Sequence, residues 1–182
     1  TENSEQILDQ TKRVSRIVQS LMSFAHSGSH LQALEPVCLS EVAQEAIGLL
    51  SLNRRSVEVE FFNLCDPAHW VEGDSQRLAQ VLINLLSNAR DASPPGGAIR
   101  VRSAASEHTV DLVVEDEGSG IPKAIMDQLF EPFFTTKGKG FGLGLFLSQA
   151  SVTRAGGTVK LYNHEDGGTL TELRLPRSYG MA

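Results

Sequence analysis

Two asparagines interrupt an apolar stretch, LINLLSNARDA, at residues 82–92. Asn84 and Asn88 are four residues apart, so a helix places them one turn apart on the same face. Gln80 and Asp91 extend this polar stripe, which carries little charge, whereas a solvated face normally carries Lys and Glu. Carboxamide oxygens suit Mg²⁺, which is usually bound by one or two protein oxygens together with phosphate oxygens and water. The alternative is that the asparagines bond only to local backbone.

The stretch VVEDEGSGIP, residues 113–122, contains a second candidate group. A predicted strand ends at Asp116, and Gly118 and Gly120 follow at alternate positions. Glycines allow a ligand or another backbone to approach closely, and a carboxylate at this point can accept a hydrogen bond from an exocyclic amine. A turn that uses Asp and Gly for conformational reasons alone is the other interpretation.

A third candidate is the glycine-rich stretch FFTTKGKGFGLGL, residues 133–145. Four of its glycines alternate with other residues, a helix is predicted to begin directly after them, and Lys137 and Lys139 add positive charge. Backbone N–H groups of such a loop and of a helix N-terminus bind anions, so the pattern suits a polyphosphate. It is neither a P-loop, because no GxxxxGK[ST] occurs, nor a eukaryotic-type kinase loop, because the VAIK and HRD motifs are missing. A flexible hinge remains the alternative.

Several secondary-structure elements must position these groups. Helices are predicted at 40–52, with Ser40 as N-cap, at 74–92, with Asp74 as N-cap, at 122–130 and at 143–157. Alternating residues predict strands at 57–63, 69–74, 98–104, 109–116, 158–163 and 169–176. The expected class is α+β, a mixed and mostly antiparallel sheet with helices on one face.

An additional helix is predicted at residues 4–26, ahead of this unit. Ile7, Val14 and Leu21 repeat every seven residues, and Ile17 and Phe24 fall on the intervening positions. This is the apolar stripe of a helical bundle, and one such helix is not stable without a partner. Because the chain supplies no second bundle helix, we expect it to be a fragment of a longer protein.

Composition narrows the classes of function. The chain has 182 residues, a formal net charge of −6 and scattered basic residues, so no basic face for nucleic acid is expected. No apolar run is long enough to span a membrane. Cys38 and Cys65 are too few for a disulfide framework and form no CxxC pair, so both are interpreted as small buried hydrophobic residues.

Taken together, the three stretches resemble the ATP-binding domain of sensor histidine kinases, within the superfamily that includes gyrase, Hsp90 and MutL. LINLLSNARDA resembles the N box, DEGSGIP the G1 box, LFEPFFTTK the F box and GFGLGLFLSQ the G2 box, in that order. The resemblance covers about residues 37–176 and implies a Bergerat-type fold. It implies three parts: a second helix of the dimerisation and histidine-phosphotransfer domain at 1–27, a linker at 28–36 and a catalytic ATP-binding domain at 37–178.

The resemblance also implies roles for individual residues. Asn88 would coordinate Mg²⁺ with Asn84 assisting, Asp116 would bind the adenine amino group, and Lys137 would contact phosphate. Phe130, Phe133 and Phe134 would anchor a mobile lid. The remaining residues of the implied ATP site are Asp91, Gly118, Gly120, Ile121, Gly140, Phe141, Gly142, Leu143, Gly144 and, near the adenine, Thr169.

Kinases and ATPases of this superfamily differ at one position. The resemblance implies that ATPases carry a glutamate general base one turn before the metal-binding asparagine, where this chain has Asn84. A neutral carboxamide does not take a proton from water at pH 7. The acceptor is therefore expected to be something other than water. The resemblance implies a histidine on the first bundle helix, with relay to a response-regulator aspartate. The usual block around that histidine, a His followed by an acidic residue and a downstream Pro, does not occur in this sequence, and His26 and His30 are interpreted as surface residues. This chain is therefore predicted to bind ATP without phosphorylating itself.

Two departures from the family pattern bear on these expectations. Many members carry a basic residue three positions after the metal-binding asparagine, where this chain has Asp91, so Lys137 and Arg77 are expected to neutralise phosphate charge. The short segment between FFTTK and GFGLGL predicts a small lid. A small lid suits the nitrogen-regulation-like and redox-regulating branches of the family, and the C-terminal part is most similar to membrane-bound, redox-responding sensor kinases. The family resemblance as a whole implies a full-length homodimer, a cytoplasmic domain and a parent protein in the bacterial inner membrane. A redox role for Cys38 would follow from the redox-responding branch, but the sequence places no basic residue beside Cys38 to activate its thiol and so does not support that role.

Overall fold

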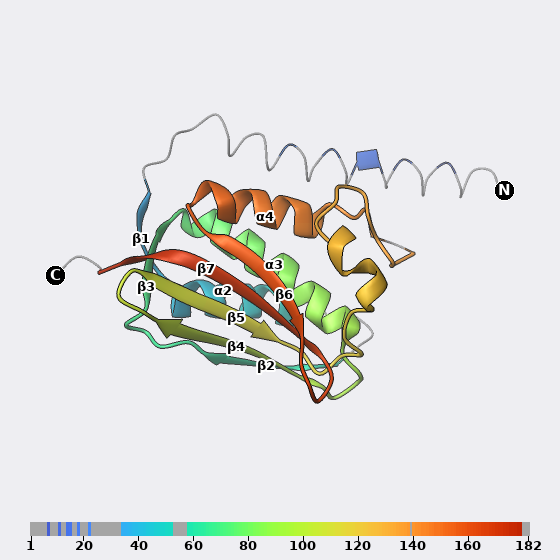
Figure 1. The fold of residues 1–182 in the computed structure, drawn as a ribbon, viewed down its shortest axis with the longest axis horizontal. Helices are drawn as coiled ribbons and strands as arrows, with labels where there is room; N and C mark the ends of the chain where they lie inside the picture. Colours follow the sequence, from blue (N-terminus) through green and yellow to red (C-terminus); the bar gives the residue numbers. More distant parts are fainter. Residues whose placement is uncertain are drawn as a thin grey trace.

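The computed structural model describes residues 34–52, 58–138 and 140–179, together with Ile7, Thr11, Val14, Ser15, Val18 and Met22. Figure 1 shows one sheet with helices packed on one side. The strands are β1 (Glu35–Cys38), β2 (Glu60–Leu64), β3 (Trp70–Gly73), β4 (Ala98–Ala105), β5 (Thr109–Glu115), β6 (Thr158–Asn163) and β7 (Thr169–Ser178). The helices are α2 (Leu39–Leu52), α3 (Ser75–Ala92) and α4 (Gly144–Arg154), with a 3₁₀ helix at Lys123–Gln128. The expected α+β class is confirmed.

The sheet is mostly antiparallel. Its hydrogen-bonded order is β1-β3-β7-β5-β4-β2, and β6 pairs with β7 beside this path. Only β2 and β4 pair in parallel among the described strands. Alternate residues of the central strands are fully buried, which identifies the covered face; these are Ile99, Val101, Val110, Leu112, Leu173 and Leu175.

Helix α3 carries the polar stripe, and its ends agree with the sequence. The Asp74 side chain caps it by accepting a hydrogen bond from the Arg77 backbone N–H at 3.1 Å. The helix ends at Ala92, directly before Ser93 and the PPGG segment. Its apolar face is buried through Leu78, Leu82, Leu85, Leu86 and Ala89. This burial holds α3 on the sheet and fixes which face is left for a ligand.

Some predicted boundaries are wrong. Helix α2 begins at Leu39, so Ser40 lies inside its first turn and is not the N-cap. Strand β1 begins at Glu35, within the segment expected to be a linker, because Glu35 and Pro36 pair with Gly73 and Glu72 of β3. The helix predicted at 122–130 is a 3₁₀ helix over Lys123–Gln128.

The N-terminal helix prediction is only partly within the described residues. Ile7, Thr11, Val14, Ser15, Val18 and Met22 are helical, and Ile7 and Val14 are 66% and 58% exposed. Leu21, Ile17 and Phe24 of the predicted stripe lie outside the described residues, as do His26 and His30. A role for this segment in dimerisation stays a prediction. Across the described part of the chain, no helix is both long and apolar enough to cross a membrane.

Both cysteines are buried free thiols. Cys38 contacts the Pro67 carbonyl and Cys65 the Val101 carbonyl, with sulfur–oxygen distances of 3.6 and 3.8 Å. Desolvation by burial raises the pKa of the Cys65 thiol to about 11. A buried, neutral thiol is a poor nucleophile, so Cys65 fits the interpretation as a packed hydrophobic residue.

The packing of α3 can be tested by substitution. Leu82 is 1% exposed in the core, so Leu82→Ala is expected to lower the free energy of unfolding by about 2–5 kcal/mol through the cavity it leaves. Leu52→Ala is the matched control, because Leu52 is 82% exposed and should change the value by less than about 0.5 kcal/mol. Urea unfolding followed by circular dichroism measures both. Equal effects of the two substitutions would contradict the packing of α3 described above.

Candidate functional site

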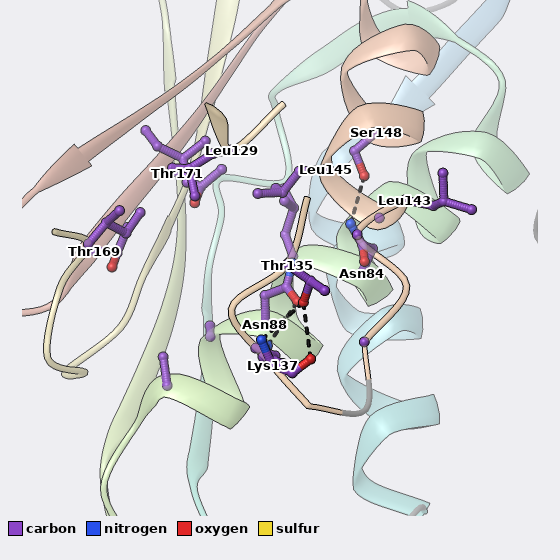
Figure 2. Close-up of a pocket in the computed structure, with 18 of the residues that line it drawn as sticks. Asn84, Asn88, Leu129, Thr135, Lys137, Leu143, Leu145, Ser148, Thr169 and Thr171 are labelled. Carbon is purple, nitrogen blue, oxygen red and sulfur yellow. Dashed lines mark hydrogen bonds between the residues drawn. The ribbon is translucent and has the colours of Figure 1, made fainter. Parts of the chain in front are cut away.

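A cavity of about 880 Å³ lies beside the polar face of α3. Its other walls are the loop after β5, the loop at 134–143, the start of α4, and residues of β6 and β7. Its volume falls within the range of small-molecule sites. Figure 2 shows the β7 residues Thr169 and Thr171 on one side, with Asn84 and Ser148 on the other.

Most of the predicted site residues are brought together here. The residues that line the cavity are Asn84, Asn88, Asp116, Gly120, Ile121, Lys137, Gly140, Phe141, Gly142, Leu143, Gly144 and Thr169. Asp91 and Gly118 do not line it, but each contacts a residue that does. Three stretches that are far apart in the sequence therefore converge on one cavity.

Asn84 joins α3 to α4. Its side-chain amide nitrogen donates to the Ser148 hydroxyl at 2.9 Å, as Figure 2 shows. A Cβ atom on Gly144 would collide with the Asn84 side chain, so only glycine permits this approach of the two helices. Asn84 thus fixes the beginning of α4, where free backbone N–H groups can receive an anion. This contact is different from the metal-assisting role that the resemblance implies.

Asn88 lies one turn further along α3 and faces a lysine. The Lys137 ammonium donates to Asn88 Oδ1 at 3.2 Å and to Asp91 Oδ2 at 3.0 Å. Two oxygens of α3 therefore already hold a cation at this point. Oxygen donors of this kind suit Mg²⁺, so the residues present fit that ion. No cluster of three or more His, Cys, Asp or Glu ligands occurs in the described part of the chain, so phosphate and water oxygens would have to complete the coordination.

Asp116 is the acidic group at the β-sheet end of the cavity. Its Oδ1 accepts from the Gly118 backbone N–H at 2.8 Å and from the Thr169 backbone N–H at 3.1 Å. Burial raises the pKa of the Asp116 carboxyl above its usual value, although these hydrogen bonds act in the opposite sense. A desolvated carboxyl in a fixed position can accept a hydrogen bond from the edge of a ligand ring.

The loop at 134–143 forms another wall of the cavity. The Phe133 backbone N–H donates to the Gly142 carbonyl at 2.9 Å, and Thr135 Oγ1 accepts from the Lys137 backbone N–H at 3.0 Å. Among the three phenylalanines expected to anchor this loop, Phe130 packs against the core, Phe134 lines the cavity and Phe133 is 65% exposed. Lys139 lies outside the described residues.

Two arginines near α3 have different positions. Arg77 lines the cavity and pairs with Asp74 through its Nε at 3.1 Å, while its buried Nη1 has no hydrogen-bond partner. Arg90 is 4% exposed and reaches the Leu50 carbonyl of α2 at 3.4 Å. Arg90 is therefore part of the α2–α3 packing and is not available to a ligand.

Two polar residues that hold the site in place were not predicted from the sequence. Ser148 bonds Asn84, and Asn163 bonds the backbone of Ile121 through its side chain. Ser148 is 64 residues from its partner and Asn163 is 42 residues from its own. The only signal for Asn163 was an asparagine at the end of a predicted strand, which also fits an ordinary turn.

Comparison with known proteins identifies the family. Residues 73–179 match the family described as histidine kinase-, DNA gyrase B-, and HSP90-like ATPase. The chain belongs to this family. The match covers α3, the loop after β5, the loop at 134–143 and the β6–β7 hairpin, which together surround the cavity.

Relatives and solved structures agree. The C4-dicarboxylate transport sensor protein DctB of Pseudomonas aeruginosa is 35% identical over 179 residues, which is 95% of this chain and 29% of DctB. The catalytic domain of histidine kinase ThkA is 30% identical with a TM-score of 0.71, and the match covers 80% of this chain and 97% of that domain. ThkA in complex with response regulator protein TrrA gives a TM-score of 0.72 at 26% identity, covering 93% and 49%. The chain spans less than a third of the length of the first curated relatives it matches.

The charge of Lys137 at the cavity predicts a ligand effect. Lys137→Met should weaken ATP binding about tenfold, because a charged donor to phosphate is lost, and should leave adenosine binding unchanged. The free energy of unfolding should barely change, because the Lys137 and Asp91 side chains are 42% and 36% exposed and exposed ion pairs contribute little stability.

Calorimetric titration measures both affinities. Lys160→Met is the matched control, because Lys160 is an exposed lysine of β6 that does not line the cavity. An equal loss of ATP affinity in both variants, or a loss of adenosine binding in Lys137→Met, would contradict this placement of the charge.

Proposed function

We propose that this chain is the catalytic part of a sensor histidine kinase, which binds ATP with Mg²⁺ and transfers the γ-phosphoryl group to a histidine. The phosphoryl group would then pass to an aspartate of a response regulator. The family and the similarity to a sensor protein and to a histidine kinase catalytic domain support nucleotide binding. The choice between a histidine and water as the acceptor of the phosphoryl group rests on the chemistry of the cavity.

The residues that line the cavity favour a kinase over an ATPase. Asp116 is the only carboxylate among the described residues that line it, and no histidine lines it. Asp116 is hydrogen-bonded to Thr169, and Figure 2 shows Thr169 on the side of the cavity away from Asn84 and Lys137.

The carboxylate of Asp91 is near the phosphate end, but it does not line the cavity and is paired with Lys137. One turn before Asn88 the side chain is Asn84, a neutral amide engaged with Ser148, so this position offers no general base for water. This favours an acceptor supplied from outside the cavity.

Different residues of the chain would bind the adenine, the Mg²⁺ ion and the phosphates. Asp116 would accept a hydrogen bond from the adenine amino group, and Ile121 would face the ring. Asn88 and Asp91 would hold the Mg²⁺ ion, which neutralises phosphate charge when bound. Lys137 and the backbone N–H groups at Gly140, Gly142 and Gly144 would receive the phosphate oxygens. Phosphoryl transfer needs mainly positioning and charge neutralisation, so these groups are a sufficient set.

Release of Lys137 from α3 would accompany this binding. Its ammonium bridges Asn88 and Asp91 in the structure, at the position proposed for the ion. The exposed pair is weak enough to exchange, so Lys137 would turn toward the phosphates as the ion takes its place. Many family members carry a basic residue at the position of Asp91. In this chain Lys137 would supply that positive charge from the loop, which leaves Asp91 available to the ion.

The proposed kinase also includes segments outside the ATP-binding domain. Residues 1–27 would belong to the second helix of a dimerisation and phosphotransfer domain, and the full-length protein would be a homodimer anchored in the bacterial inner membrane. The substrate histidine would lie on the first helix of that domain. The exposed Phe133 would face those helices.

A trans-phosphorylation assay tests this function. The chain is mixed with γ-labelled ATP, Mg²⁺ and the full-length protein carrying Asn88→Ala, which keeps its histidine but should lose its own ATP chemistry. Label that is acid-labile and base-stable is expected on the full-length protein only when the chain is present. The chain alone is expected to stay unlabelled.

Other outcomes would replace the proposal. Nucleotide binding without any label would favour a binding module whose ATP state controls an interaction. Steady release of free phosphate would favour an ATPase, because it would mean that water is the phosphoryl acceptor although Asn84 stands where ATPases carry a glutamate. Acid-labile label on the chain alone would refute the prediction that it lacks an acceptor. The same assay with the Lys160→Met chain controls for unspecific loss.

A further inference from the structure

Asn163 binds the backbone of Ile121 through both polar atoms of its side chain. Its Nδ2 donates to the Ile121 carbonyl at 2.7 Å, and its Oδ1 accepts from the Ile121 backbone N–H at 2.7 Å. Both backbone groups of one loop residue are thereby satisfied by one amide side chain, as a neighbouring strand would satisfy them. Ile121 lines the cavity, whereas Asn163 does not.

The position of Asn163 in the β6–β7 hairpin explains why it can act on this loop. Asn163 is the last residue of β6 and pairs with Thr169, the first residue of β7. The Thr169 backbone N–H donates to Asp116 Oδ1 at 3.1 Å, and its carbonyl accepts from the Asp116 backbone N–H at 3.0 Å. One cross-strand pair therefore holds both ends of the loop at 116–121, Thr169 at its beginning and Asn163 at its end.

The conformation of the loop depends on this contact. Gly120 has a φ of +75°, which favours glycine, and a Cβ atom there would lie 3.0 Å from Asn163 Oδ1. The first half of the loop is also held by Glu117, which accepts a hydrogen bond from the Ala98 backbone N–H and pairs with Arg100. The second half contains no regular strand or α-helix before the 3₁₀ helix that begins at Lys123, and Asn163 holds it at Ile121. Without Asn163 the Ile121 backbone groups would have only water as partner.

We infer that Asn163 is a positioning residue for the base end of the nucleotide site, and that it sets the distance between the Ile121 wall and the Asp116 carboxyl. The inference rests on the proposed function, because that distance matters only if a flat ring bearing an amino group binds between the two. Asn163 touches no ligand itself. It contributes selectivity for adenine by keeping a preformed slot for the ring.

Binding measurements on the 182-residue chain test this inference. Asn163→Ala should weaken ATP and ADP about fivefold to tenfold, as expected for two lost hydrogen bonds of modest net strength. Binding of inorganic tripolyphosphate should not change, and the preference for ATP over GTP should fall. Asn163→Asp, which keeps the acceptor for the Ile121 N–H, should recover part of the affinity. Glu165→Ala is the matched control, because Glu165 is exposed in the same hairpin turn.

The outcomes separate this inference from the proposed function. If the unsubstituted chain does not bind ATP, the proposed function fails. If it binds ATP and Asn163→Ala keeps both its affinity and its preference over GTP, the positioning role is overturned while the proposed function stands. An equal loss of tripolyphosphate binding would also overturn it, because that loss would reflect general destabilisation.

Amide hydrogen exchange gives a second readout, and its decisive measurement uses the unsubstituted chain, so it does not depend on a folded Asn163→Ala variant. In the unsubstituted chain, the Ile121 amide should exchange slowly, although its residue lies in a loop. The Asn163→Asp variant should keep much of this protection and Asn163→Ala should lose it, while the Val114 amide in β5 stays protected in each. Fast exchange at Ile121 in the unsubstituted chain would contradict the contact and the role built on it.

Discussion

Burial of the leucine face of α3 is the constraint on which the rest of the site depends. Leu78, Leu82 and Leu85 are nearly inaccessible to solvent, so the rotation of α3 about its axis is fixed. With this face against the sheet, Asn84 and Asn88 must point into the cavity. The cost of placing two amides beside an apolar face is offset by partners: Ser148 for Asn84, and Lys137 for Asn88.

The two ends of the cavity are held in different ways. At the sheet end, Asp116 and the loop after it are fastened to the β6–β7 hairpin by backbone and side-chain hydrogen bonds. At the other end, the loop that carries Lys137 is held to α3 through an exposed ion pair with Asp91, which is easily exchanged. A ring site that is preformed, beside a phosphate loop that can rearrange, suits a domain that takes up a nucleotide and then presents its phosphoryl group to a separate acceptor.

The sequence predicted what local chemistry decides. The Asp74 cap, the end of α3 at PPGG and the alternating strands β4 and β5 rest on short-range patterns, and each is found in the structure. Ser40 failed as a cap because the pairing of β1 with β3 carries the chain directly into α2 at Leu39. The partners of Asn84 and Asn163 could not be predicted, because they come together only when α3 meets α4 and the hairpin meets the loop after β5. Likewise, the sequence places Arg90 close to Asn88 but does not reveal that Arg90 is buried against α2.

Paramagnetic broadening by Mn²⁺ tests the proposed cation and nucleotide site at Asn88 most directly, because Mn²⁺ accepts the same oxygen ligands as Mg²⁺. With Mn²⁺ and ATP together, nuclear magnetic resonance signals of Asn88, Asp91 and Gly140 should broaden, while those of Val37 in β1, at the opposite end of the sheet from this part of α3 (Figure 1), stay sharp. Mn²⁺ without ATP should have little effect, since the protein supplies few of the ligands. Broadening centred elsewhere, or equally strong without ATP, would contradict a site in which α3 and the nucleotide hold the ion together.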